Sequence, residues 1–166
     1  MRFKKIMMGL VACGLMTGLT GCITVDSVFG EQDPQVSSVQ LQALQTREFQ
    51  ATEEQAFAAV ISTFQDYGYL INSADRATGM VLAKTTTDAE INHFTGITRT
   101  EHNKATAFIE KVAKDRVKIR VSIVKAVSAK HSYGGGGEKE AMRTKPEIYQ
   151  EIFAKIQHSL FLKKNL

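Results

Sequence analysis

Two histidines and three acidic residues share one polar stretch of the sequence, and these side chains are the ones best suited to metal chemistry. His93 and His102 lie nine residues apart, close to Asp88, Glu90 and Glu101. Imidazole nitrogens and carboxylate oxygens bind divalent metals, but a site needs several of them converging at bonding distance. Their spacing matches no known ligand pattern. We therefore expect a solvated polar segment, with neither a metal ion nor a cofactor.

Other catalytic chemistries lack their sequence signatures. A G-x-S-x-G run, which would hold a serine nucleophile on a strained strand-to-helix turn, does not occur. The glycine run Gly134–Gly137 lacks the following Lys-Ser/Thr pair of a phosphate-binding loop. We interpret it as part of a flexible loop over residues 132–140, because glycine gives the backbone maximal freedom. The sequence predicts a protein that is not an enzyme.

A cluster of basic residues surrounds one expected hairpin: Lys111, Lys114, Arg116, Lys118 and Arg120. Binding to single-stranded nucleic acid would also require aromatic side chains on which bases stack, and Phe108 is the only ring nearby. We expect no nucleic-acid partner. Basic residues also protect edge strands from pairing with other chains, and we prefer this role to contact with anionic lipid or an acidic partner.

The beginning of the sequence has the features of a secretory signal. Arg2, Lys4 and Lys5 precede an apolar stretch over residues 6–19, which at about 14 residues is shorter than the roughly 20 needed to span a bilayer. The residues from Leu19 onward read LTGC, so two small residues lead directly to a cysteine.

This order of features resembles the lipobox of bacterial lipoproteins. The resemblance implies cleavage before Cys22, lipid attachment to its sulfur and acylation, for example by palmitate, of its new amino group. Several acyl chains would hold the protein firmly on a membrane without spanning it. The alternative is an ordinary cleaved signal followed by an incidental cysteine.

Cleavage at that point would leave one domain on a short tether. Residues 1–21 would be the lipoprotein signal peptide, residues 22–38 a flexible tether, and residues 39–166 a single α+β domain. The net charge of +4 falls to +1 once the three basic residues of the signal are removed, so the charge does not indicate nucleic acid as a partner. Cys13 leaves with the signal and Cys22 carries lipid, so no disulfide is expected.

Two amphipathic helices are the clearest expected elements. The first covers residues 53–67, begins after a capping box over Thr52–Gln55 and ends at Gly68 in a left-handed cap. The second opens with a capping box over residues 144–147, with Pro146 in its first turn. Their buried stripes recur at helical spacing: Phe57, Val60, Ile61 and Phe64, then Ile148, Ile152, Phe153, Ile156 and Leu160.

Alternating apolar residues predict the strands, which cover residues 39–50, 69–73, 80–85, 105–113 and 117–123. In the first of these, Leu44 and Phe49 interrupt the alternation, so a bulge or a short helical turn remains open. Residues 86–104 are either a long connection or a weak, exposed strand. The resulting order β-α-β-β-β-β-α predicts an antiparallel sheet of about four to five strands, with two helices on one face and a polar, exposed opposite face.

Two stretches resemble a family of uncharacterised bacterial, periplasm-facing lipoproteins. Residues 41–85 contain a Gln-Thr-Arg-x-Phe strand motif, a helix ending Gln-Asp-x-Gly and an Ala-Asp…Gly hairpin, and residues 146–162 form a helix with the motif Ser-Leu-Phe-Leu. The resemblance implies a small α+β domain on a lipid anchor and no catalytic or ligand site. Its matching polar and turn positions are Arg47, Asp66, Asp75 and Gly79. We expect Asp66 to lie at a helix end and Asp75 and Gly79 to lie in a turn. We prefer these roles to an ion pair of either acid with Arg47.

Ile23, and not an aspartate, follows the lipobox cysteine. In Gram-negative bacteria the sorting rule that this resembles directs a lipoprotein to the outer membrane. We expect a non-enzymatic, periplasm-facing lipoprotein that binds another envelope protein as an accessory or assembly factor. The alternative is a module for a small ligand or lipid, which would require an apolar cavity of about several hundred Å3 between the helices and the sheet.

Overall fold

The computed structural model describes residues 33–164, so the expected signal, the expected lipid site at Cys22 and the expected tether as far as residue 32 lie outside the described residues. The fold is α+β, as predicted, but its antiparallel sheet has seven strands and it has three helices. In chain order the elements are α2 (Ser38–Gln45), β1 (Thr46–Phe49), α3 (Glu53–Asp66), β2 (Tyr69–Asp75), β3 (Met80–Thr85), β4 (Asp88–Asn92), β5 (Ile97–Ala113), β6 (Arg116–His131), β7 (Gly136–Met142) and α4 (Pro146–Lys164).

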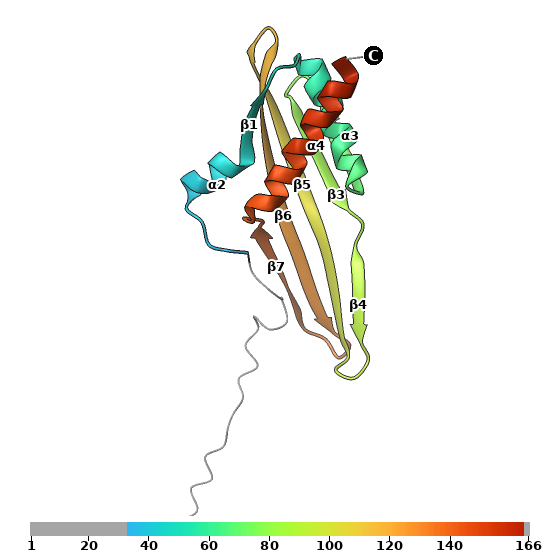
Figure 1. Ribbon diagram of the computed structural model, residues 1–166. Helices are drawn as coiled ribbons and strands as arrows, with labels where there is room; N and C mark the ends of the chain where they lie inside the picture. The colour runs from blue at the N-terminus through green and yellow to red at the C-terminus, as the bar shows by residue number, and fades with distance from the viewer. Residues whose placement is uncertain (1–32, 165–166) are drawn as a thin grey trace, which may run out of the picture.

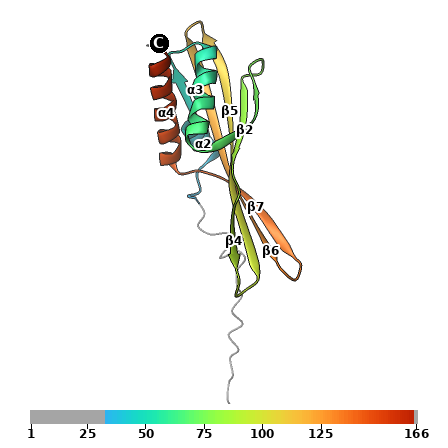
Figure 2. The ribbon, with the colours of Figure 1, turned by 90° about the vertical axis from the view of Figure 1, so that its right-hand side faces the viewer.

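A long hairpin of β5 and β6 runs through the whole sheet. The main path is β1-β6-β5-β3-β2, while β4 also pairs with β5 and β7 also pairs with β6. We call the part that contains β1, β2 and β3 the covered tier, because α3 and α4 lie on one of its faces (Figure 1). We call the other part, β4 and β7 with their partner residues 97–101 and 124–130, the extension. Figure 2 shows the extension projecting beyond the helices.

The covered tier is stabilised by an apolar layer between the helices and the sheet. The predicted stripes of both helices face this layer, and β6 contributes its odd-numbered residues. The largest fully buried apolar side chains are Tyr149, Phe64, Phe153, Ile119, Ile156, Val60, Val81, Val117 and Val121. Burying an aliphatic or aromatic side chain of this size contributes about 1.5–3 kcal/mol, so this layer is the main source of stability.

The chain before β1 forms a helix over Ser38–Gln45, where we predicted a strand over residues 39–50 and left a short helical turn open as an alternative. Ser37 caps α2: its Oγ accepts the N–H of Gln40, whose side chain in turn accepts the N–H of Ser37. Val39, which the alternation placed on a buried face, is exposed. The capping box therefore outweighed the period-2 pattern, and only Thr46–Phe49 remains extended.

Most of the glycine-rich segment is a strand and not a flexible loop, which corrects our prediction for residues 132–140. Only residues 132–135 separate β6 from β7. Gly136 lies so close to β6 that an added Cβ would be 2.5 Å from the Ala129 carbonyl oxygen. Glycine is needed there because two backbones approach closely, not because the chain must be free to move.

For the polar residues 86–104 we left open a long connection or a weak, exposed strand, and the structure shows strands. These residues make β4 and the first part of β5, both exposed or only partly buried. The two-residue turn at Lys114–Asp115 is present as expected, and Gly68 and Gly79 have positive φ. The strands on either side of that turn are much longer than expected, 17 and 16 residues.

Asp33 holds the chain against the domain before α2 begins. Its carboxylate accepts the Arg143 Nε–H at 2.7 Å and the Thr144 N–H at 2.9 Å, and its side chain is 9% exposed. Residues 33–38, the last part of the expected tether, thus include a fixed contact. Thr144, which we expected to cap α4, donates its hydroxyl to the Pro34 carbonyl instead.

Candidate functional site

The histidines and acids that we considered for metal chemistry are spread along β4, β5 and the turn between them. His93 is in the turn after β4. His102 is on β5, where it pairs with Ala126 of β6, and it lies outside the residues of β5 that pair with β4. Glu101 is engaged by Arg99 at 3.2 Å and by Lys125 at 2.6 Å. Among residues 33–164, no group of three or more His, Cys, Asp or Glu side chains lies close enough to hold a metal ion.

The four family positions have separate structural roles. Arg47 lies over the Phe153 ring, with its guanidinium carbon 5.1 Å from the ring centroid, and Asp66 is 3.4 Å from Lys155. Asp75 shapes the β2–β3 turn by accepting the Ala77 N–H and the Thr78 hydroxyl, both at 2.9 Å. The hydroxyl of Thr78 and the N–H of Ala77 lower the pKa of Asp75. These residues do not converge on one site.

The sheet face opposite α3 and α4 is exposed, as predicted, but it is not uniformly polar. Met80 on β3 lies directly opposite Phe108 on β5, and Leu82 follows on the same face. Phe108 is 41% exposed. We call these three side chains the apolar row. Exposed apolar side chains grouped in this way are typical of a contact surface, because isolated ones need no explanation but grouped ones do.

A groove of about 510 Å3 runs beside the apolar row, between α2 and the strands β5 and β6. Val39 and Phe108 are its large apolar side chains. Lys118 is neutralised by Glu110 at 2.6 Å, whereas Arg120 donates to the neutral side chain of Gln45 at 3.4 Å. The groove therefore combines apolar contact area with a guanidinium bonded to a neutral amide.

Gln45 holds α2 beside this groove. It is 1% exposed, although it is polar, and it lies between helix α4, strand β6 and strand β7. Its amide nitrogen is 3.5 Å from the Tyr149 hydroxyl, which itself donates to the Arg143 carbonyl at 2.6 Å. A buried amide must find partners, so these contacts fix where the chain crosses from the open face to the core.

The layer where a ligand cleft was expected is packed with side chains. The aromatic rings of Phe49 and Phe153 are 6.1 Å apart between β1 and α4, and those of Phe64 and Tyr69 are 5.7 Å apart between α3 and β2. Val60 and Ile119 in the same layer are fully buried. This packing gives no support to a ligand site between the helices and the sheet.

Sequence reasoning missed the apolar row, although a signal was present. Residues 80–83 read MVLA, so β3 is apolar at both parities, which is typical of a strand with contacts on both faces. Phe108 likewise follows a buried residue of β5 and precedes another, Ala107 and Ile109. Reading the two parities separately would have identified a second apolar face.

Comparison with protein-family models and with curated proteins found no match. Among the described residues, none of the helices has the length and apolar character needed to cross a bilayer.

Proposed function

We propose that this protein is a lipid-anchored, non-enzymatic lipoprotein of the bacterial envelope, attached through Cys22 and facing the periplasm from the outer membrane. Its role is that of an accessory or assembly factor that binds another envelope protein. The lipobox-like residues and the family resemblance support the anchor. The apolar row on the open sheet face is the single observation that supports a protein partner.

The open face favours a protein segment over a small ligand. The groove beside it is open, and it is lined by residues of α2, β1, β5 and β6, not enclosed within a core. Protein interfaces typically place an aromatic anchor at their centre with arginine close by. Phe108 and Arg120, directly opposite each other on β5 and β6, supply that pair.

The chemistry of the groove defines the partner. Phe108 and Met80 would contact apolar side chains, and Arg120 would bind a carboxylate in place of its long contact with Gln45. A charge-assisted bond to a carboxylate is roughly twice as strong as a bond between neutral groups. We therefore expect an amphipathic segment with an acidic residue next to its apolar face.

Site-specific photo-crosslinking in intact cells tests this function. A photoreactive residue at Leu82, next to the groove, should give a recurrent adduct with one envelope protein, and mass spectrometry should find lipid on Cys22. Leu162, which is also an exposed leucine but lies on α4, is the matched control and should give no such adduct. Phe108→Ser should remove the Leu82 adduct without changing the circular dichroism spectrum, because Phe108 is on the surface.

Equal adduct patterns at Leu82 and Leu162 would contradict a partner on the open face. An unmodified Cys22 would contradict the lipid anchor. The two parts of the proposal can therefore fail separately.

A further inference from the structure

Two tight turns form the end of the extension, and each presents one aromatic side chain. In the β4–β5 turn, the Asn92 side-chain oxygen accepts the N–H groups of Phe94 and Thr95 at 3.0 and 3.1 Å. In the β6–β7 turn, the His131 N–H donates to the Gly135 carbonyl at 3.0 Å. Both turns are thus closed by their own hydrogen bonds.

The two turns are also joined to each other. The N–H and the hydroxyl of Ser132 both donate to the Gly96 carbonyl oxygen, at 2.9 and 2.8 Å. Ile97 and His131 lie opposite each other in the adjoining strands, so the turns end at the same level. Gly96 has a φ of 66° and its position leaves little room for a side chain, since an added Cβ would be 3.2 Å from the Ser132 hydroxyl.

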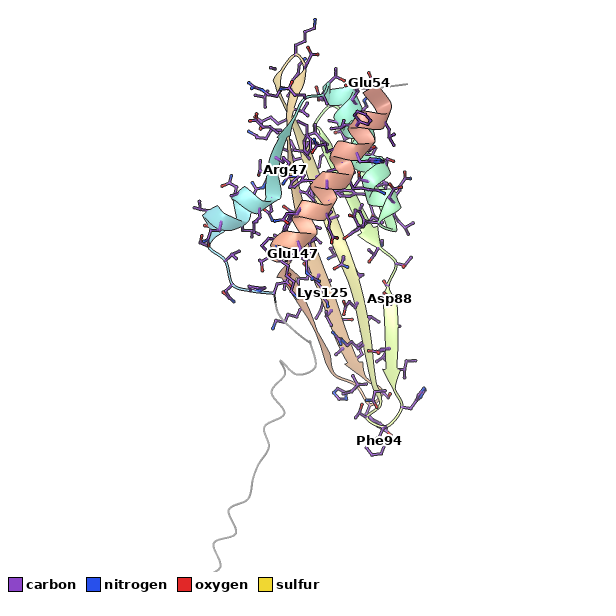
Figure 3. All side chains as sticks on the ribbon, in the orientation of Figure 1. Arg47, Glu54, Asp88, Phe94, Lys125 and Glu147 are labelled. Atoms are coloured by element: carbon purple, nitrogen blue, oxygen red, sulfur yellow. The ribbon has the colours of Figure 1, made fainter. Side chains whose placement is uncertain are left out.

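The aromatic side chains at this end are as exposed as side chains can be. Phe94 is 100% exposed and Tyr133 is 99% exposed, and the nearby Ile91 on β4 is also exposed. Figure 3 shows Phe94 pointing away at the end of the molecule opposite Glu54. Tight turns that hold two aromatic side chains fully in solvent bring the domain no packing benefit, and two such side chains on joined turns are the arrangement that an external contact site would use.

We infer that Phe94 and Tyr133 form a membrane-contacting tip that enters the headgroup region of the bilayer to which Cys22 is attached. Tyrosine favours this region because its apolar ring carries a polar hydroxyl, and phenylalanine contributes apolar area that can enter the boundary with the acyl chains. The inference depends on the lipid anchor of the proposed function, and it adds a second membrane contact to that anchor.

The balanced charges around the tip indicate that it contacts the lipid surface through its apolar side chains and not through charge. Residues 88–99 and 130–139 carry three acidic and three basic side chains, which balance: Asp88, Glu90, Glu138, Arg99, Lys130 and Lys139. A tip that bound anionic lipid by charge would have an excess of lysine and arginine. The contact should therefore be insensitive to salt and to lipid charge.

The length of chain before Asp33 allows the anchor and the tip to reach one membrane. Asp33 binds Arg143, whose N–H donates to the Ile123 carbonyl, so the described chain begins beside the middle of β6. From Ile123 to the tip at His131 is eight residues of strand, or about 26 Å. Cys22 lies eleven residue steps before Asp33, and this stretch reaches at most about 36–40 Å when fully extended, which exceeds that distance.

Tryptophan fluorescence tests the tip directly, because the chain contains no tryptophan. Full-length acylated Phe94→Trp protein would be incorporated into phosphatidylcholine vesicles with and without brominated acyl chains. We expect a blue-shifted emission that brominated lipid quenches and that high salt does not change. The matched control is Phe161→Trp, an exposed aromatic position on α4 at the other end of the domain, which should be neither shifted nor quenched.

Each other outcome overturns the inference in a distinguishable way. Acylated protein in which Phe94→Trp is quenched no more than Phe161→Trp would exclude the tip contact while leaving the anchor intact. Quenching that appears only with anionic lipid at low salt would replace the apolar contact with an electrostatic one. A Cys22 that mass spectrometry finds without lipid would remove the anchor and, with it, the shared membrane.

Discussion

The covered tier and the extension share the same two strands but are stabilised differently. In the covered tier, the odd-numbered residues of β6 from Val117 to Ile123 are buried beneath helices. In the extension the same side of β6 continues with Lys125 and Val127, and Val127 lies opposite Glu101 and Lys139. The extension is held together by backbone hydrogen bonds between its strands and by ion pairs, and not by an apolar layer.

This difference means that the covered tier provides the stability of the domain, whereas the extension holds side chains at the surface. Exposed ion pairs contribute about 0–1 kcal/mol each, whereas buried apolar side chains contribute several times more. The extension is therefore a weakly stabilised arm that depends on the covered tier for its folding. Regions with few buried apolar contacts open locally at lower free energy, and such regions often carry binding surfaces.

The largest effect should come from the core of the covered tier. Phe153→Ala should lower the free energy of unfolding by about 3–5 kcal/mol, because it removes a buried ring and leaves a cavity. Val127→Ala in the extension should cost about 1–2 kcal/mol, since its neighbours are long polar side chains that can adjust. Urea unfolding followed by circular dichroism measures both. Equal costs would show that the extension contains a core of its own.

A second comparison uses one glycine from each region. Gly79→Ala should cost about 3 kcal/mol, because φ is 69° and the new Cβ would be 2.2 Å from the Ile109 carbonyl oxygen. Gly134→Ala in the tip should cost only about 1 kcal/mol: its φ is 97°, but no atom lies within 4 Å of the added carbon. Thermal unfolding of the two variants would test this order. A larger loss of stability for Gly134→Ala than for Gly79→Ala would contradict the view that the exposed tip contributes little to the stability of the domain.

The third comparison concerns Asp33, which binds beside the boundary between the two regions. Burial opposes its ionisation, but the Thr144 N–H and the Arg143 guanidinium outweigh burial and lower the pKa of Asp33 below its ordinary 3.8. Asp33→Asn should cost about 1–2 kcal/mol at pH 7, because the charge-assisted contacts are lost.

The pH dependence of that cost follows from the sign of the shift. A lowered pKa in the folded state stabilises the protein fully above the ordinary value of 3.8, and this contribution is lost as the pH falls through the folded-state value. The difference between wild type and Asp33→Asn should therefore shrink in acid. Asp115→Asn, in the exposed turn between β5 and β6, is the control and should change stability little. A difference that stays constant with pH would show that the charge of Asp33 is not responsible.

Local sequence signals determined the helices and turns of the covered tier. The Thr52–Gln55 capping box and the stripes of α3 and α4 predicted those helices, and Gly79 and the Lys114–Asp115 turn were placed correctly. Such features are visible in the sequence because caps, turns and 3.6-residue spacing involve neighbours in the chain. The capping box at Ser37 was also present, and we overlooked it in favour of the alternation.

Only the tertiary structure decided the two candidate contact surfaces. The apolar row requires β3 to pair with β5, and the tip joins the turns that carry Phe94 and Tyr133, which are 39 residues apart in the sequence. The second half of the glycine run joined β7 because β6 offered it a partner, which no local pattern reveals. Strand pairing is non-local, so the sequence by itself determined the two long helices and the tight turns, whereas the assembled sheet determined which further segments became strands and which side chains meet at its surface.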